Sequence, residues 1–83
     1  MNLTDNEVNE IFSELILNER IKQRKTQGKL SNLSGVTRVN IAKIETKCSG
    51  TTLNTAIKLL EALDLNLGIL DKYIDLYKGG CDE

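Results

Sequence analysis

The sequence contains no proline, no histidine and no tryptophan, and it has only two cysteines in 83 residues. Because histidine is absent and Cys48 and Cys81 form no CxxC pair, the ligand spacing of a structural zinc site is missing. The usual nucleophile and base pairings are missing too, and no glycine-rich phosphate loop occurs. We therefore expect no metal, no cofactor and no enzymatic activity. Cys48 is interpreted as a buried or bystander thiol rather than a redox switch.

Long apolar runs are also absent. No stretch approaches the roughly 20 residues that a membrane span needs, and the acidic N-terminus lacks the basic region of a signal peptide. Two widely separated cysteines fit a reduced compartment. We expect a cytoplasmic protein that does not enter a membrane.

Length and periodicity favour one small helical domain over residues 1–83. Such a chain buries only roughly 60% of its unfolded surface, so a partner subunit would add useful burial. Few segments alternate with the two-residue period of a half-buried strand. Three- and four-residue apolar spacing instead predicts an all-α, compact bundle of about five helices. The expected helices cover residues 5–23, 27–33, 38–46, 53–63 and about 69–78, with Thr37 and Thr52 as N-caps.

Charge is segregated along the chain, although its formal net value is only −1. Residues 1–19 carry five acidic side chains and no basic one, and residues 48–83 carry a net charge of −3. Residues 20–47 carry a net charge of +7. A solvated helical surface accounts for the total but not for this separation. The central block predicts one basic face that can meet phosphates.

The segment from 26 to 45 has the residue spacing of two short helices joined by a sharp turn. Gly35 stands where the turn needs a left-handed backbone, and Ser31 is small where the two helices approach. Apolar anchors follow at Leu30, Val36, Ile41 and Ile44. Counting 100° per residue, the third helix turns an opposite, mixed face outward, which comprises Val39, Ala42, Lys43 and Thr46, with Arg38 at its border on the first turn. Such a face suits base edges and thymine methyl groups in a DNA major groove, whereas an ordinary helical hairpin would not require Val39 there.

Residues from about 16 to 67 resemble the phage-repressor and Cro-like helix-turn-helix family, also called the XRE family. The resemblance is carried by Gln27, by Ser31, by Gly35-Val36-Thr37, by Ile41-Ala42-Lys43-Ile44-Glu45 and by the following TLNTAIKLLEALDLNL. It implies a lambda-repressor-like domain of bacterial or phage origin, with its helix-turn-helix unit at residues 27–46. Gly28 departs from the family pattern, as do Lys25 and Ser34. Gly28 should weaken its helix by up to about 1 kcal/mol relative to alanine.

The resemblance also implies roles for single residues. Gln27 would hold a phosphate with its backbone amide and side chain and would support a base-reading residue. Arg38, Val39 and Lys43 would read bases. Arg20 and Glu45 would form a structural ion pair that fixes helix geometry. The expected sugar and phosphate contacts come from Thr37, Asn40, Thr46 and Lys47.

The C-terminal helix has an apolar seam formed by Leu70, Tyr73, Ile74 and Tyr77. The seam can pack on its own domain or meet its copy in a dimer, and we interpret it as a dimerisation surface. The leading hypothesis is therefore a sequence-specific regulator, a repressor that binds a pseudo-palindromic operator in double-stranded DNA as a homodimer. The alternative is the antitoxin of a toxin-antitoxin pair, which binds a toxin and autoregulates its operon. The acidic N-terminal helix and the tyrosine-bearing tail motivate this alternative and the expectation of a second protein, a toxin or an anti-repressor.

Overall fold

The computed structural model describes residues 3–47 and 51–79. Five α-helices account for most of these residues, and the described part contains no strand. The helices are α1 (Asp5–Lys22), α2 (Gln27–Ser34), α3 (Arg38–Glu45), α4 (Leu53–Ala62) and α5 (Ile69–Tyr77). The all-α prediction is confirmed, and the helix bounds differ from the expected ones by a residue or so. Cys48 and Cys81 lie outside the described residues.

Threonine side chains start four of the five helices. The hydroxyls of Thr4, Thr26, Thr37 and Thr52 each accept a hydrogen bond from the backbone N–H three residues later. At α1 the Glu7 carboxylate also accepts the Thr4 backbone N–H at 2.8 Å, which completes a capping box. Each cap satisfies an N–H that the first helical turn leaves without a partner. Local sequence therefore fixes where these helices begin.

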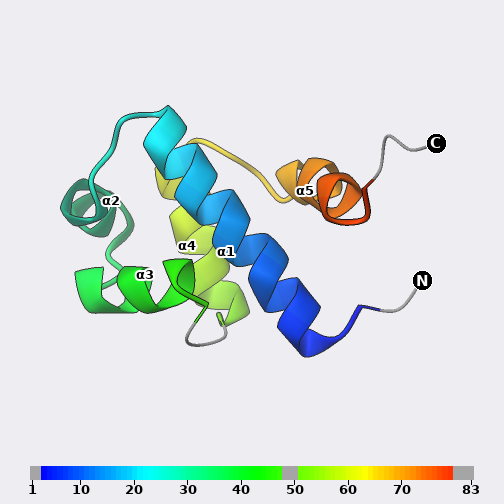
Figure 1. The fold of residues 1–83 in the computed structure, drawn as a ribbon. Coiled ribbons are helices and arrows are strands. Elements are labelled where there is room, and N and C mark those ends of the chain that lie inside the picture. Colours follow the sequence, from blue (N-terminus) through cyan, green and yellow to red (C-terminus); the bar gives the residue numbers. More distant parts are fainter. Residues whose placement is uncertain (1–2, 48–50, 80–83) are drawn as a thin grey trace.

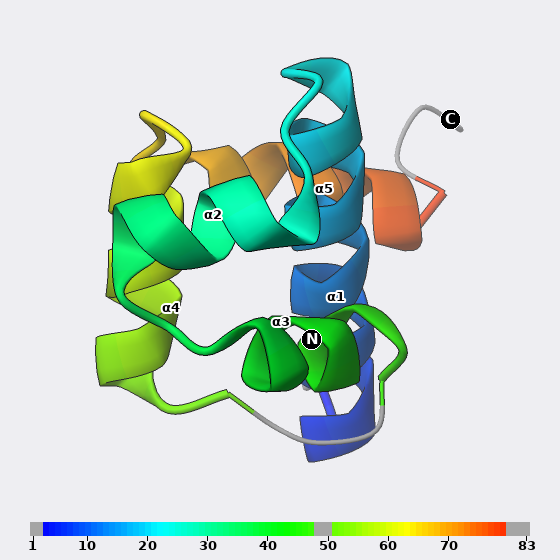
Figure 2. The same cartoon turned by 90° about the vertical axis from the view of Figure 1, so that its left-hand side faces the viewer.

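Helix α1 runs through the middle of the molecule and connects its two ends (Figure 1). At one end α2 and α3 pack on each other, with α4 beside α2, and at the other end α5 packs on α1. Turned by 90°, the molecule shows α2 and α3 at the front, while α5 lies at the back (Figure 2). The helix-turn-helix unit and the C-terminal helix thus occupy opposite ends of the domain.

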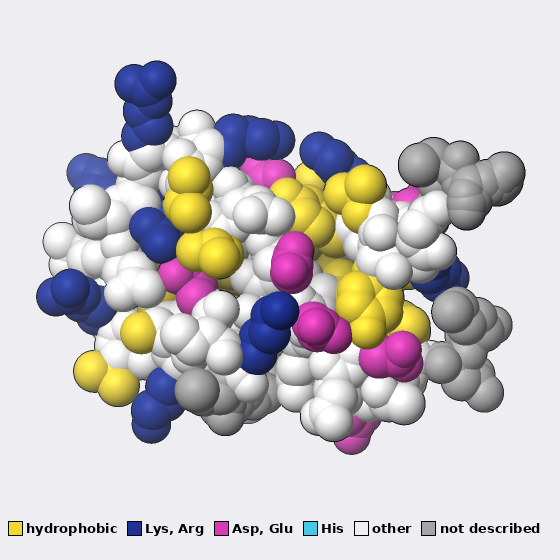
Figure 3. All heavy atoms as spheres, in the orientation of Figure 1, with side chains coloured by type: hydrophobic (Ala, Val, Ile, Leu, Met, Phe, Trp, Pro, Cys, Tyr) yellow, Lys and Arg dark blue, Asp and Glu magenta, His cyan; other side chains and the backbone are white. Residues whose placement is uncertain are grey.

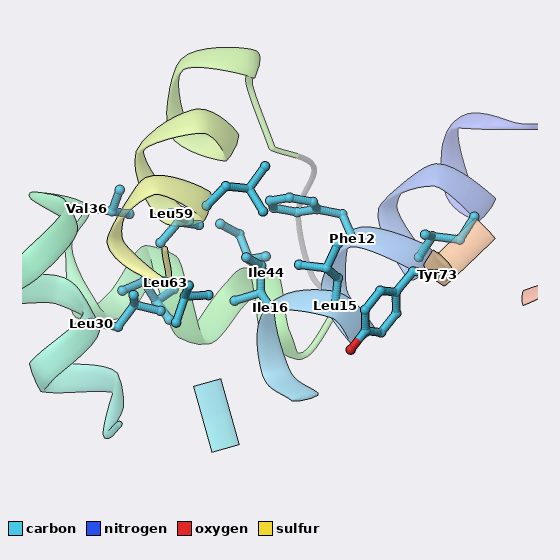
Figure 4. Packing of buried hydrophobic residues seen from close by; sticks show 12 residues of the cluster. Phe12, Leu15, Ile16, Leu30, Val36, Ile44, Leu59, Leu63 and Tyr73 are labelled. Carbon is cyan, nitrogen blue, oxygen red and sulfur yellow. The ribbon is translucent and has the colours of Figure 1, made fainter. Parts of the chain in front are cut away.

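One apolar core joins these elements. It contains Ile11, Phe12, Leu15 and Ile16 of α1, Leu30, Val36, Ile41 and Ile44 of the helix-turn-helix unit, Leu59, Leu60 and Leu63 of the α4 region, and Tyr73 of α5. Helix α1 packs on α3 and α5, and α2 packs on α3 and α4, so the buried side chains form one cluster (Figure 4). None of the helices in residues 3–47 and 51–79 is long and apolar enough to cross a membrane.

Candidate nucleic-acid interface

Helix α3 has one buried face and one exposed face. Ile41 and Ile44 are fully buried in the core. Arg38 and Lys43 are exposed, and Val39 keeps 66% of its surface in solvent. An exposed β-branched side chain between two cations gives this face both apolar contact and hydrogen-bond donors. A major groove offers partners for both, because its base edges present hydrogen-bond acceptors and thymine presents a methyl group.

A buried carboxylate holds α3 against α1 and α2. Arg20 Nε and Nη2 donate to the two carboxylate oxygens of Glu45, at 2.7 and 3.0 Å. The same carboxylate accepts from Gln27 Nε2 at 2.9 Å, and Ser13 Oγ donates to the Glu45 backbone carbonyl at 3.0 Å. Only 4% of the Glu45 side chain is exposed. Because the interactions come from two other helices, they fix the direction of α3.

The turn between α2 and α3 has three features that stabilise its shape. Gly35 adopts a left-handed conformation with φ of 79°. Ser31 Oγ donates to the Val36 carbonyl at 2.7 Å, and Ser34 Oγ accepts the Val36 N–H at 3.1 Å. Ser31 is therefore more than a small residue at a close approach. Ser34, which departs from the family pattern, takes part in the turn.

The residues predicted to contact sugar and phosphate lie on α3, at its two ends and at the start of α2. Thr37, Thr46 and Lys47 are exposed, and Asn40 and Gln27 are half-buried. Some of their polar atoms already have partners in the chain. Thr37 caps α3, and the Thr46 hydroxyl donates to the Ala42 carbonyl at 2.9 Å. The Gln27 side-chain amide is directed to Glu45, so the backbone N–H of Gln27 is the better phosphate donor.

Lys47 has neighbours that the sequence pattern did not predict. It follows α3 with a φ of 65°, and its Nζ lies 3.5 Å from Glu10 and 3.7 Å from Glu14. All three side chains are substantially exposed to solvent. Exposed ion pairs of this kind are weak, so a phosphate can compete with the two carboxylates. The two acidic residues of α1 nevertheless reduce the positive charge at this edge of the interface.

Four exposed cations lie on α3, on α2 and just before α2. Arg24, Lys29, Arg38 and Lys43 are exposed, and none of them forms a salt bridge within the described part of the chain. In Figure 3, basic side chains gather over the end that carries α2 and α3, and most of the acidic ones lie over α1 and toward α5. The molecule is therefore polarised along its length, which favours approach of a polyanion to the α3 end.

Two residues before α2 have structural roles that sequence reasoning missed. Gln23 Nε2 donates to the Leu63 carbonyl at 2.7 Å, and Lys25 Nζ donates to Gln23 Oε1 at 2.7 Å. Lys25 Nζ also lies 3.3 Å from the Ala62 carbonyl. These contacts satisfy carbonyls at the C-terminal end of α4. They join residues about 40 positions apart, so no local pattern could have indicated them.

The predicted dimerisation residues of α5 divide into two groups. Tyr73 is 8% exposed, and its hydroxyl donates to the buried carboxylate of Glu19 at 2.8 Å. Burial, followed by that hydrogen bond and the negative charge of Glu19, raises the pKa of Tyr73 to about 12. Tyr77 is exposed and donates to Glu10 at 3.0 Å. Leu70 and Ile74 are half-buried and line an apolar groove. Tyr73 is thus part of the core of a single chain, and its side chain is not free to contact a second copy.

Comparison with known proteins agrees with this geometry. A family model described as helix-turn-helix matches residues 16–70, which is more than half of the chain. Comparisons with curated proteins and with solved structures gave no significant match. The five-helix fold and the family match together identify a helix-turn-helix DNA-binding protein. The chain belongs to the XRE, or Cro-like, helix-turn-helix family of DNA-binding transcriptional regulators.

Proposed function

We propose that this regulator is a repressor that binds a pseudo-palindromic operator as a homodimer. The observation that carries the proposal is the exposed outer face of α3, where Arg38, Val39 and Lys43 stand together on a helix whose other face is fixed in the core. A rigid helix with a mixed exposed face is suited to reading base edges. A two-fold assembly would require half-sites with centres about 10 base pairs apart.

Each exposed residue of α3 has a chemical counterpart in the major groove. Arg38 and Lys43 can donate to the O6 and N7 atoms of guanine, and Val39 can contact a thymine methyl group. The backbone N–H of Gln27 at the start of α2 and the side chains of Thr37, Asn40, Thr46 and Lys47 supply sugar and phosphate contacts. Contacts of this second kind set the position of the protein on the duplex but carry no sequence information.

Selection from random duplexes followed by affinity measurement tests the proposal. Fluorescence anisotropy with the enriched duplex should show that Arg38→Ala weakens binding by about 1 to 3 kcal/mol per half-site and removes the preference at one base pair. Lys72→Ala, an exposed lysine on α5 at the opposite end of the molecule, is the matched control and should change little. Failure to enrich any sequence would count against the proposal. So would an Arg38→Ala variant that loses as much affinity for random DNA as for the enriched duplex. A reporter promoter that overlaps the operator should lose expression if the regulator represses.

A second candidate is an antitoxin, favoured by the outer face of α1 and α5. Glu10, Glu14, Leu76 and Tyr77 border a groove there, and Leu76 is 61% exposed although DNA reading does not need it. Co-expression with the product of the neighbouring reading frame tests this candidate. A stable complex that relieves toxicity and is broken by Leu76→Glu would support it. Unrelieved toxicity would exclude it.

A further inference from the structure

Residues 23–26 form the turn that joins α1 to α2, and α1 itself holds the backbone of this turn (Figure 2). The N–H of Arg24 donates to the Ile21 carbonyl at 2.9 Å. The N–H of Lys25 donates to the Arg20 carbonyl at 3.0 Å. Arg24 has a left-handed backbone with a φ of 59°, which lets the chain reverse its direction after α1. The course of this turn therefore determines where α2 begins.

The ammonium group of Lys25 connects the turn to the C-terminal end of α4. Its Nζ donates to Gln23 Oε1 at 2.7 Å and to the Ala62 carbonyl at 3.3 Å. Gln23 Nε2 donates to the Leu63 carbonyl at 2.7 Å. Carbonyls at the C-terminal end of a helix carry partial negative charge, so a cation is favourable there. We call these three hydrogen bonds the Lys25 clip.

Lys25 differs from its cationic neighbours in the chain. Arg24 and Lys29 are exposed, and neither forms a salt bridge within the part of the chain that the structure describes. Lys25 is half-buried, and its ammonium donates to acceptors of its own chain. A phosphate contact would require this ammonium to leave the Ala62 carbonyl and the amide that it holds. Position and charge alone would place Lys25 among the phosphate contacts, but its hydrogen bonds give it another role.

Arg20 links the position of the turn to α3. Its Nη1 donates to the backbone carbonyl of Lys25 at 2.8 Å, while Nε and Nη2 donate to the Glu45 carboxylate. The side chain of Gln27, two residues after Lys25, donates to the same carboxylate. A displaced turn would therefore move the start of α2 and would also weaken the contacts that orient α3.

We propose that Lys25 and Gln23 are positioning residues for DNA binding, which place the start of α2 through the Lys25 clip, and that Lys25 itself contacts no phosphate. The inference rests on the phosphate contact that the proposed function gives to the backbone N–H of Gln27. A backbone N–H has no rotatable side chain with which to adjust, so only the course of the main chain can aim it. The turn immediately before α2 sets that course.

Salt dependence separates a positioning residue from a phosphate contact. A lysine that neutralises a phosphate releases a counterion, so its removal makes the dependence of log K on log salt shallower by about one. We expect Lys25→Ala to weaken binding of the enriched duplex by about tenfold, the worth of one hydrogen bond to a charged group, with the slope unchanged. Lys47→Ala is the matched comparison, because it removes the same charge from an expected phosphate contact and should make the slope shallower.

Gln23→Ala breaks the Lys25 clip without any change of charge. It should weaken binding by a factor similar to that of Lys25→Ala, again with the wild-type slope. The double variant Gln23→Ala, Lys25→Ala should lose little more affinity than either single variant, because residues of one hydrogen-bond network are not additive. Fluorescence anisotropy at several salt concentrations measures affinities and slopes, and circular dichroism at the same temperature checks that each variant is folded. A purely structural clip would lower only the unfolding temperature.

Three outcomes would overturn the inference. One is a folded Lys25→Ala or Gln23→Ala variant that binds the duplex as tightly as the wild type. Another is a slope that becomes shallower by about one in Lys25→Ala, which would make this lysine a phosphate contact. The last is full additivity of the two losses in the double variant, which would exclude a shared clip. All three presuppose a wild type that binds, whereas a wild type that enriches no duplex would defeat the proposed function itself.

Discussion

The guanidinium of Arg20 and the carboxylate of Glu45 join α1 to α3 through two hydrogen bonds of 2.7 and 3.0 Å. The Arg20 side chain is 14% exposed, and the Glu45 side chain is 4% exposed. A buried pair of this kind adds little net stability, because desolvation of both charges offsets their attraction. Its value here is geometric, since it sets how α3 stands on the domain.

Removal of one partner should therefore destabilise the domain much more than removal of both. We expect Glu45→Ala to lower the free energy of unfolding by about 3 to 5 kcal/mol, because Arg20 is left without its counter-ion. The double variant Arg20→Met, Glu45→Leu should recover most of that loss. Urea unfolding followed by circular dichroism measures both. A double variant no more stable than Glu45→Ala would contradict this interpretation.

Tyr73, which links α5 to α1, should make the domain less stable at alkaline pH. The pKa of Tyr73 is about 12 in the folded chain and about 10 when unfolded, so its stabilising contribution is complete below pH 10. That contribution is lost as the pH rises from about 10 through about 12. Tyr73→Phe should abolish this part of the pH dependence. At neutral pH it should cost about 1.5 to 3 kcal/mol, since a donor to a charged acceptor is removed.

Thermal unfolding as a function of pH measures the effect of Tyr73. Tyr77→Phe is the control, because that hydroxyl is exposed and its pKa is raised mainly by the hydrogen bond to Glu10. It should leave stability at neutral pH unchanged. Equal alkaline behaviour of wild type and Tyr73→Phe would show that another group is responsible.

Replacement of two glycines by alanine should change the free energy of unfolding in opposite directions. A methyl group at Gly28 would meet only Thr26 Oγ1, at 3.8 Å, so Gly28→Ala should stabilise the domain by up to about 1 kcal/mol. Gly35 has open space around it but a φ of 79°, so Gly35→Ala should cost about 1 to 2 kcal/mol. Urea midpoints of the two variants provide the comparison. A loss of stability in Gly28→Ala would mean that this glycine is needed for more than its small size.

Lys47 should contribute equally to the affinity for all DNA sequences. We expect Lys47→Ala to reduce affinity for random and selected duplexes by the same factor and to make the salt dependence shallower by about one. Glu14→Gln should have the opposite effect, because it removes one of the two carboxylates that compete with phosphate for Lys47 and leaves only Glu10. Anisotropy titrations at several salt concentrations measure the slopes. A sequence-dependent effect of Lys47→Ala would assign it to base reading instead.

The helix positions and the turn could be predicted because their signals are local. Threonine caps, Gly35 and the apolar spacing all lie within a few residues of the structure they specify. Burial of Tyr73, capping of α4 by Gln23 and the position of Lys47 beside α1 were missed, since each depends on segments that approach only after the chain has folded. The Arg20 and Glu45 pair was foreseen from family resemblance, not from spacing.

The frame that holds α3 uses only one side of that helix. Ile41, Ile44 and Glu45 attach it to the domain, whereas the side chains of Arg38, Val39 and Lys43 are exposed to solvent. New side chains can therefore be installed at those three positions without weakening the scaffold. Libraries randomised there should yield folded variants with changed target sequences, which makes the domain a compact starting point for engineered gene switches.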